Sequence, residues 1–188
     1  MPRIPAVTTA DAGVVGRLIY RVAARRYGTV PEPLAVARHH RGVFWASLVS
    51  ELGYERASRR LPAHLRELAV YRVATLVDCS WCVDFGTMLQ RLDGLDVERL
   101  TQIDSYATNP LFTPDERLVL AYADAMTALP ITVTDAQVAE LAAVLGRAGL
   151  VELTTQIALE NMRARSNSAL GIIDQGFDAA CQVRASRD

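Results

Sequence analysis

An all-α, compact multi-helix fold is predicted for this chain from its composition, its helix-boundary signals and its lack of strand patterns. Apolar residues make up 51% of the 188 residues and aromatic residues only 6%, so the apolar part is mostly Ala, Leu and Val. That mixture favours helices. No segment alternates convincingly with the period of two that marks a strand. The length fits a single domain, 1–188, which we divide into an N-terminal helical region, 1–60, and a core, 61–171.

The N-terminal region is expected to contain two helical segments. The first spans 11–28 and ends at Gly28, which suits the left-handed residue after a helix. Its apolar face is predicted to consist of Val15, Leu18, Ile19 and Val22. After the break at "TVPEP", a second helical segment is expected from about 34 to 60, with a bend near residues 41–42.

The core begins with a helix that Pro62 opens, and a further helix starts near Cys79 and fades at "LDGLD". Two later helix starts carry capping boxes, in which a threonine side chain and a Glu or Gln three residues later satisfy each other's backbone N–H groups. These pairs are Thr113 with Glu116 and Thr134 with Gln137. The helices that follow are expected at about 115–129, 135–145 and 149–168.

Charge and hydropathy exclude several classes of partner. The chain has 20 basic and 21 acidic residues in an interspersed pattern, which predicts no nucleic-acid partner and no attraction to an anionic membrane. No apolar run approaches the roughly 18–20 residues of a membrane span, and no secretory signal opens the chain. With only three cysteines, a cytoplasmic location is expected. The mean hydropathy of +0.13 is high for a monomer and indicates an apolar surface covered by a second subunit.

The segment "DCSWCVDFG" places Cys79 and Cys82 three positions apart. With Asp78 as the expected N-cap, both thiols would lie on one side of a helix N-terminus, which favours thiolates and lets the two sulfurs form a disulfide. The pair could instead be two small buried side chains. A metal site is the weakest alternative, because zinc needs further ligands and the remaining candidates lack ligand-like spacing. Those candidates are Cys181, His39, His40 and His64. We therefore expect no metal and no bound cofactor.

Glu67 is the other candidate residue. It lies in a helix that is apolar nearly all round, which predicts a central, buried helix. Burial would raise the pKa of its carboxyl and allow it to accept a proton near neutral pH. The alternative is a structural ion pair with Arg66, with Arg72 or with a partner on another helix.

The pattern E-x11-C-x2-C, formed by Glu67, Cys79 and Cys82, resembles the carboxymuconolactone decarboxylase-like superfamily and its alkylhydroperoxidase D-like branch. The phrases "RIPAV", "SWCVDFG" and "ALENMRARSNSALGI" are also similar to its members. The resemblance implies an oligomer, a trimer or a larger ring such as a hexamer, and a thiol-dependent peroxidase. It further implies that Cys82 attacks the peroxide, Cys79 resolves the sulfenic acid, Glu67 belongs to the proton relay, and an external dithiol protein or lipoyl-type partner is the reductant. The substrate is then a small hydroperoxide or another apolar organic molecule.

Two departures from the peroxidase pattern stand out. Gly86 occupies the position of the histidine in C-x2-C-x3-H, and Trp81 occupies the position of a second histidine between the cysteines. A faint internal repeat lays 65–86 over 150–171 and puts Ala164 and Asn167 where the second copy would have cysteines. Asn167 could therefore face the dithiol.

We expect an enzyme, an alkylhydroperoxidase-like antioxidant protein. Two alternatives stay open at this point. One is a carboxymuconolactone decarboxylase-like lyase, which would not need the cysteine pair. The other is a non-catalytic oligomeric binding protein on the same scaffold.

Overall fold

The computed structural model describes residues 2–177, and within these residues it contains helices and no strand. The α-helices are α1 (Gly13–Tyr27), α2 (Glu32–Ala37), α3 (Arg41–Ala57), α4 (Ala63–Leu76), α5 (Ser80–Leu92), α6 (Pro114–Thr127) and α7 (Asp135–Leu170). A 3-10 helix, η1 (Glu98–Ser105), joins α5 to α6. The all-α fold class is confirmed.

Three helix boundaries follow the predicted capping chemistry. Thr113 and Thr134 each accept a hydrogen bond from the backbone three residues later, and Glu116 and Gln137 complete the reciprocal bonds. Gly28 ends α1 in the left-handed conformation with a φ of 88°. These positions are therefore set by local side-chain and backbone preferences, as the sequence predicts.

Helix α4 forms the centre of the core. It packs against α5, α6 and α7, and its buried residues occupy nearly every side of the helix. The main apolar cluster lies between α4, α6 and α7 and includes Leu65, Val73, Val119, Leu153 and Ile157. The predicted central position of the helix that carries Glu67 is thus correct.

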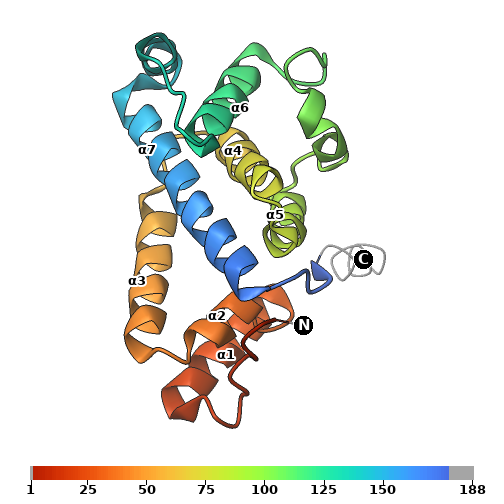
Figure 1. The fold of residues 1–188 in the computed structure, drawn as a ribbon, viewed down its shortest axis with the longest axis vertical. Coiled ribbons are helices and arrows are strands. Elements are labelled where there is room, and N and C mark those ends of the chain that lie inside the picture. The colour runs from red at the N-terminus through yellow and green to blue at the C-terminus, as the bar shows by residue number, and fades with distance from the viewer. Residues whose placement is uncertain (1, 178–188) are drawn as a thin grey trace.

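The N-terminal helices α1, α2 and α3 lie at one end of the molecule and along one side of α7 (Figure 1). The single bent helix expected from about 34 to 60 is in fact two helices, α2 and α3, with residues 38–40 between them. His40 separates them, because its Nδ1 atom accepts a hydrogen bond from the backbone of Val43 at 3.1 Å and thereby caps α3. Ion pairs from Arg26 to Glu55 and from Arg163 to Glu51 connect α3 to α1 and α7.

The predicted apolar face of α1 is not its buried face. Val15, Leu18 and Val22 are exposed, whereas Gly16, Tyr20 and Ala23 are buried. The side of α1 that faces the rest of this chain is formed by a tyrosine and small residues, which a pattern based on aliphatic residues overlooks. Of the four predicted residues, only Ile19 is partly buried, against the N-terminal apolar cluster, and the other three are left uncovered.

Helix α7 runs through the middle of the molecule, with α3 on one side and α4 to α6 on the other (Figure 1). Gly146, with φ 68° and ψ 164°, interrupts it, so the two predicted helices are present with the break between them. By length and composition alone α7 could cross a membrane, in contrast to the expectation that no segment is long and apolar enough. Core helices of soluble proteins meet the same criteria, and buried residues of α7 such as Leu153 and Ile157 belong to the core cluster.

Candidate dithiol site

Cys79 and Cys82 are joined in a disulfide at the start of α5, with a distance of 2.18 Å between the sulfurs and 5.3 Å between the Cα atoms. Cys79 is the N-cap of α5, and its Sγ atom accepts a hydrogen bond from the backbone N–H of Cys82 at 3.2 Å. The prediction of Asp78 as the N-cap is therefore wrong by one residue. Asp78 makes the turn between α4 and α5 instead, with a φ of 56°, a conformation that Asp tolerates better than most residues.

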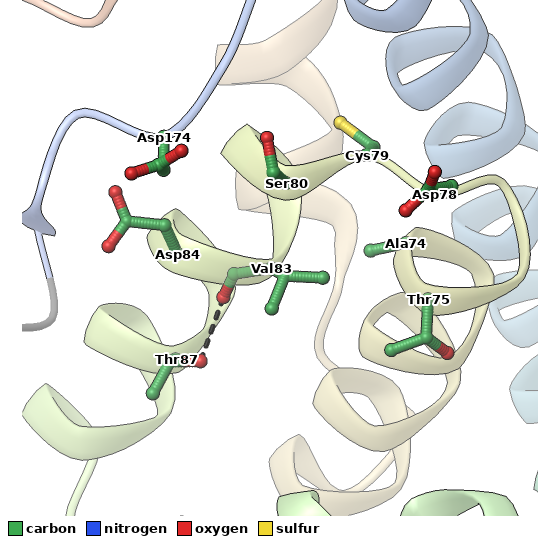
Figure 2. Close-up of a pocket in the computed structure, with 9 residues that line it drawn as sticks. All are labelled: Ala74, Thr75, Asp78, Cys79, Ser80, Val83, Asp84, Thr87 and Asp174. Atoms are coloured by element: carbon green, nitrogen blue, oxygen red, sulfur yellow. Dashed lines mark hydrogen bonds between the residues drawn. The ribbon is translucent and has the colours of Figure 1, made fainter.

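The sulfur atoms are buried although a cavity reaches the site. Cys79 and Cys82 are 1% and 6% exposed and pack against Ala74, Trp81 and Ala164. A cavity of about 560 Å³ has Cys79 among its lining residues. The cavity contains three carboxylates and no cationic side chain among its lining residues, which are Ala74, Thr75, Asp78, Cys79, Ser80, Val83, Asp84, Thr87 and Asp174. In Figure 2, Asp84 and Asp174 lie close together on one side of Ser80, and Cys79 and Asp78 lie on its other side.

The last turn of α7 supplies the polar side chain next to the sulfurs. Asn167 is 5% exposed, and its Nδ2 atom lies 3.5 Å from the Sγ atom of Cys82 and 3.9 Å from that of Cys79. Ala164, one turn earlier, packs in the same cluster as both cysteines. The two residues that replace the cysteines in the faint repeat thus do face the dithiol.

Two buried carboxylates lie further along α4 and α7. Burial raises the pKa of Glu67, while its ion pair with Arg66, at 2.9 Å, opposes that rise. Burial likewise raises the pKa of Glu160 to about 7, against the attraction of Arg163. Glu67 lies seven residues before Ala74, whose carbonyl accepts a hydrogen bond from the backbone of Cys79, so about 10 Å of helix separates Glu67 from the level of the disulfide. The predicted ion pair with Arg66 is confirmed, and the rise in pKa is present alongside it.

A C-terminal segment crosses the start of α5. We call residues 172–177 the C-terminal strap. Asp84 accepts hydrogen bonds at 3.0 Å from the backbone N–H groups of Gln175 and Phe177, and the Trp81 indole N–H donates to Gln175 at 2.7 Å. Phe177 is buried against Trp81 and Phe85. The aromatic residues beside the dithiol therefore pack against one another and against the C-terminal strap.

The other residues considered from sequence lie elsewhere. His39 bonds to the carbonyl of Pro5, His40 caps α3, and His64 is exposed at the start of α4. Cys181 lies outside the described residues. Within residues 2–177 no group of three or more His, Cys, Asp or Glu side chains is arranged to hold a metal ion.

Comparisons with known proteins identify a sequence relative and solved structures with a similar fold. No protein-family model matches the chain. It is 33% identical over 163 residues to the uncharacterized protein YnjA of Escherichia coli (strain K12), covering 87% of this chain and 88% of YnjA. Among solved structures, a peroxidase-related protein of Ralstonia eutropha JMP134, described as an alkylhydroperoxidase AhpD core, has a TM-score of 0.81 with 17% identity and 94% of each chain covered. The debrominase Bmp8 has a TM-score of 0.79 with 17% identity, over 95% of this chain and 96% of its own.

The chain belongs to the same family as YnjA. It has the fold of the alkylhydroperoxidase AhpD-like structures. Within that fold, the disulfide-bonded cysteine pair lies at the start of α5.

The histidine that is missing from the AhpD-like pattern would lie at Gly86, on the side of α5 that faces Tyr71 of α4. A Cβ atom added at Gly86 would lie 3.5 Å from the Cδ2 atom of Tyr71, an ordinary contact. Tyr71 lies on α4 one turn after Glu67. His39, His40 and His64 are engaged or placed elsewhere, so none of them replaces the imidazole beside the dithiol.

Two residues of this AhpD-like site were weakly signalled or missed by sequence reasoning. Asn167 was signalled only through the faint repeat. Glu160 was missed, because a glutamate on a long helix is usually exposed and only the packing of α3, α4 and α7 around it shows that it is buried.

Proposed function

We propose that this protein is a cytoplasmic, thiol-dependent oxidoreductase that reduces organic hydroperoxides with the Cys79–Cys82 dithiol. The observation that carries the proposal is the closed disulfide at the N-terminus of α5. The Cα atoms are 5.3 Å apart, within the roughly 4.4–6.8 Å range of ordinary disulfides. The pair can therefore store two oxidising equivalents without unwinding α5.

The proposed oxidation has two steps. The Cys82 thiolate attacks the terminal oxygen of the hydroperoxide, an S–O bond forms, the O–O bond breaks, and the departing alkoxide takes a proton and leaves as the alcohol. Cys79, as a thiolate, then attacks the Sγ atom of the Cys82 sulfenic acid, and hydroxide leaves as water after taking a proton. The sum is dithiol plus hydroperoxide giving disulfide, alcohol and water.

We assign Glu67 to the proton transfers of this reaction. Its raised pKa and buried position suit a group that exchanges protons near neutral pH. Since about 10 Å separates it from the level of the disulfide, the proton must pass through an intervening group or solvent. We expect Glu67→Gln to slow hydroperoxide-dependent oxidation about tenfold or more, measured by stopped-flow Trp81 fluorescence, while the disulfide still forms with a thiol oxidant.

The reductant is proposed to be an external dithiol, carried by a protein or a lipoyl-type group. Reduction by such a partner proceeds through a mixed disulfide, so the partner's sulfur must reach one of the two cysteines. Cys79 is the cysteine that borders the cavity, and the cavity's volume of about 560 Å³ is large enough for a lipoyl group.

We further propose that the protein is a homo-oligomer, a trimer or hexamer. Helices α1 and α3 expose aliphatic and aromatic side chains, including Val14, Leu18, Val43, Trp45 and Val49, in numbers unusual for a monomer. The occupant that suits an apolar face of this kind is a second copy of the same chain.

A non-catalytic binding protein is the second candidate function. Gly86 in place of the histidine and the near-complete burial of both sulfurs favour it. In that case the cysteines would act as packing residues, and their thiols would resist alkylation in the native state.

The deciding experiment is intact mass spectrometry of the reduced Cys181→Ser protein before and after one equivalent of cumene hydroperoxide. Removing Cys181 leaves Cys79 and Cys82 as the only thiols. We expect a loss of about 2 Da from disulfide formation, a stable sulfenic acid with a gain of about 16 Da in Cys79→Ser, and no rapid change in Cys82→Ser. An unchanged mass together with slow alkylation of both thiols would instead identify the binding protein.

A further inference from the structure

We propose that Asn167 is a catalytic residue of the dithiol site: its side-chain amide donates a hydrogen bond to the Sγ atom of Cys82 and stabilises the thiolate that forms there when the disulfide opens. The inference rests on the proposed dithiol function and adds a residue from α7 to it. It also identifies which of the two sulfurs leaves during reduction.

The two sulfurs have different hydrogen-bond donors. The Sγ atom of Cys79, the N-cap of α5, accepts a hydrogen bond from the backbone N–H of Cys82 at 3.2 Å. Cys82 lies 3.5 Å from Nδ2 of Asn167, which is closer than the 3.9 Å from Nδ2 to Cys79. Each sulfur thus has a donor of its own, one from the backbone and one from a side chain.

The surrounding charges make such a donor necessary. Asp78, Asp84 and Asp174 line the cavity next to Cys79, and the cavity lining contains no Lys, Arg or His. On the α7 side, Arg163 and Glu160 bond to each other one to two turns before Asn167. The Arg3 guanidinium donates hydrogen bonds to the carbonyls of Ser168 and Ala169 at the end of the helix. Nearby carboxylates disfavour a thiolate, and the site has no imidazolium to oppose them. A neutral amide donor supplies this stabilisation without adding a charge.

The burial of Asn167 supports the same conclusion. The residue is 5% exposed, and a buried amide loses free energy unless it is hydrogen-bonded. A disulfide sulfur is a weak acceptor, whereas a thiolate carries a full negative charge, and hydrogen bonds to charged groups are roughly twice as strong as neutral ones. The bond from Asn167 therefore becomes stronger when the disulfide is reduced, which is the property that lowers the barrier to opening it.

The reductive step follows from this arrangement. A thiolate of the external dithiol attacks the Sγ atom of Cys79, which borders the cavity. The new S–S bond forms there as the Cys79–Cys82 bond breaks, and its electron pair passes to the Sγ atom of Cys82, facing Asn167. The second thiol of the reductant, as a thiolate, then attacks its own first sulfur and releases Cys79. The reductant leaves as a disulfide, and its two protons end on the cysteines.

The test compares Asn167→Ala and Asn167→Asp with Asn161→Ala and Asn161→Asp, all in the Cys181→Ser background. Asn161 is a matched control, because it is a partly buried asparagine on the same helix that bonds to Thr127 and Ile157 rather than to sulfur. Two quantities are measured: the equilibrium constant with a dithiothreitol redox buffer, and the pH profile of alkylation of the reduced protein. Circular dichroism of the oxidised forms verifies folding.

We expect both Asn167 variants to shift the equilibrium towards the disulfide by about tenfold to a hundredfold, and to move the alkylation midpoint to higher pH. Shifts no larger than those of the Asn161 variants would overturn the proposal. So would a shift in Asn167→Asp without one in Asn167→Ala, because added charge would then be the cause.

If those variants do not fold, the proposal can be tested on the reduced protein with its native Asn167. The side-chain amide NMR signal of Asn167 is expected to titrate together with the Cys82 thiol, and a signal that stays unchanged across that titration would contradict the bond. Neither measurement uses a peroxide. A protein that fails to reduce hydroperoxides can therefore still show the Asn167 effect, and the two proposals fail separately.

Discussion

Glu160 is a buried carboxyl group whose burial raises its pKa. It lies on α7 two turns before Asn167, is buried, and bonds to Arg163, which in turn pairs with Glu51 on α3. Burial raises its pKa from 4.5 to about 7 despite this partner, and Glu67 contributes to the rise. Near neutral pH the folded protein therefore holds a proton there that the unfolded chain does not.

The stability of the protein should depend on pH through this residue. Between pH 4.5 and about 7 the folded state binds more protons at Glu160 than the unfolded state, so the free energy of unfolding falls as pH rises. The difference between the two pKa values corresponds to a loss of about 3 kcal/mol. From pH 5 to pH 8, we expect the free energy of unfolding to fall less in Glu160→Gln than in the parent protein. Urea denaturation of the oxidised forms measures this difference.

Glu55→Gln provides the control for that experiment. Its carboxylate is exposed, and its pKa is lowered chiefly by a hydrogen bond from Arg26, so its loss should leave the decline between pH 5 and pH 8 in place. An undiminished decline in Glu160→Gln would show that another group, such as Glu67, is responsible.

The chemistry-bearing residues differ in how far the sequence could predict them. The disulfide between Cys79 and Cys82 is predictable because two cysteines three positions apart at the start of a helix lie close enough to form it. Glu67 is predictable as a buried carboxylate because apolar residues surround it on every side of its helix. Asn167 depends on how α7 crosses α5, a long-range packing relation that a pattern along the chain does not contain.

At the scale of helices, the contact between α4 and α5 leaves room for the histidine that this chain lacks. A side chain at Gly86 would meet the Tyr71 ring at an ordinary contact distance. We predict that Gly86→His increases the rate of hydroperoxide-dependent oxidation about tenfold or more, because an imidazole there would lie between α4, which carries Glu67, and the dithiol helix. Stopped-flow Trp81 fluorescence measures the rate.

Gly86→Ala is the matched control, since it adds the Cβ atom without the imidazole. It is expected to leave the oxidation rate unchanged and, by replacing a mid-helix glycine, to stabilise the protein by up to about 1 kcal/mol. Equal rates in Gly86→His and Gly86→Ala would show that the missing histidine does not limit the reaction.

The C-terminal strap gives a second prediction at this scale. Gln175 bonds to Trp81, and it also accepts from the backbone of Glu32, so it links α5 to α2. Because the sulfurs are nearly inaccessible, loosening the strap should expose them. We expect Gln175→Ala to accelerate reduction of the disulfide by dithiothreitol several-fold and to shift the Trp81 fluorescence maximum. Ile173→Ala, at an exposed residue of the same strap that does not line the cavity, is the control and should change neither by a comparable amount.

The limits of the sequence are also visible in particular helices. The capping boxes at Thr113 and Thr134 and the glycine at 28 are local signals, so the ends they mark were correctly predicted. The N-cap of α5 was predicted one residue early, because Asp78 is the better capping residue in general but here occupies the left-handed turn. The 3-10 helix η1 was missed, since its short polar sequence has no clear period.

At the scale of the whole molecule, the predicted division at residue 60 stays a prediction. The two parts differ in how many of their apolar side chains are buried within this chain. Residues of α4 to α7 form a shared apolar core. In contrast, α3 has Phe44 as its one buried residue in this chain, and its exposed side chains include Trp45, Val49 and Leu52. Most of the apolar face that the sequence predicts on α1 is exposed in this chain. This mismatch is resolved if the burial occurs between subunits.

The last prediction concerns that assembly. Leu18 on α1 is 57% exposed and Val49 on α3 is 66% exposed; a charge at such positions costs little in a monomer but several kcal/mol at a dry interface. We expect the protein to be a trimer or hexamer by light scattering, and Leu18→Glu with Val49→Glu to dissociate it. Ile131→Glu, at an exposed apolar residue between α6 and α7, should leave it assembled. A monomeric parent protein, or equal dissociation by the control, would mean that the apolar faces of α1 and α3 are not the subunit interface.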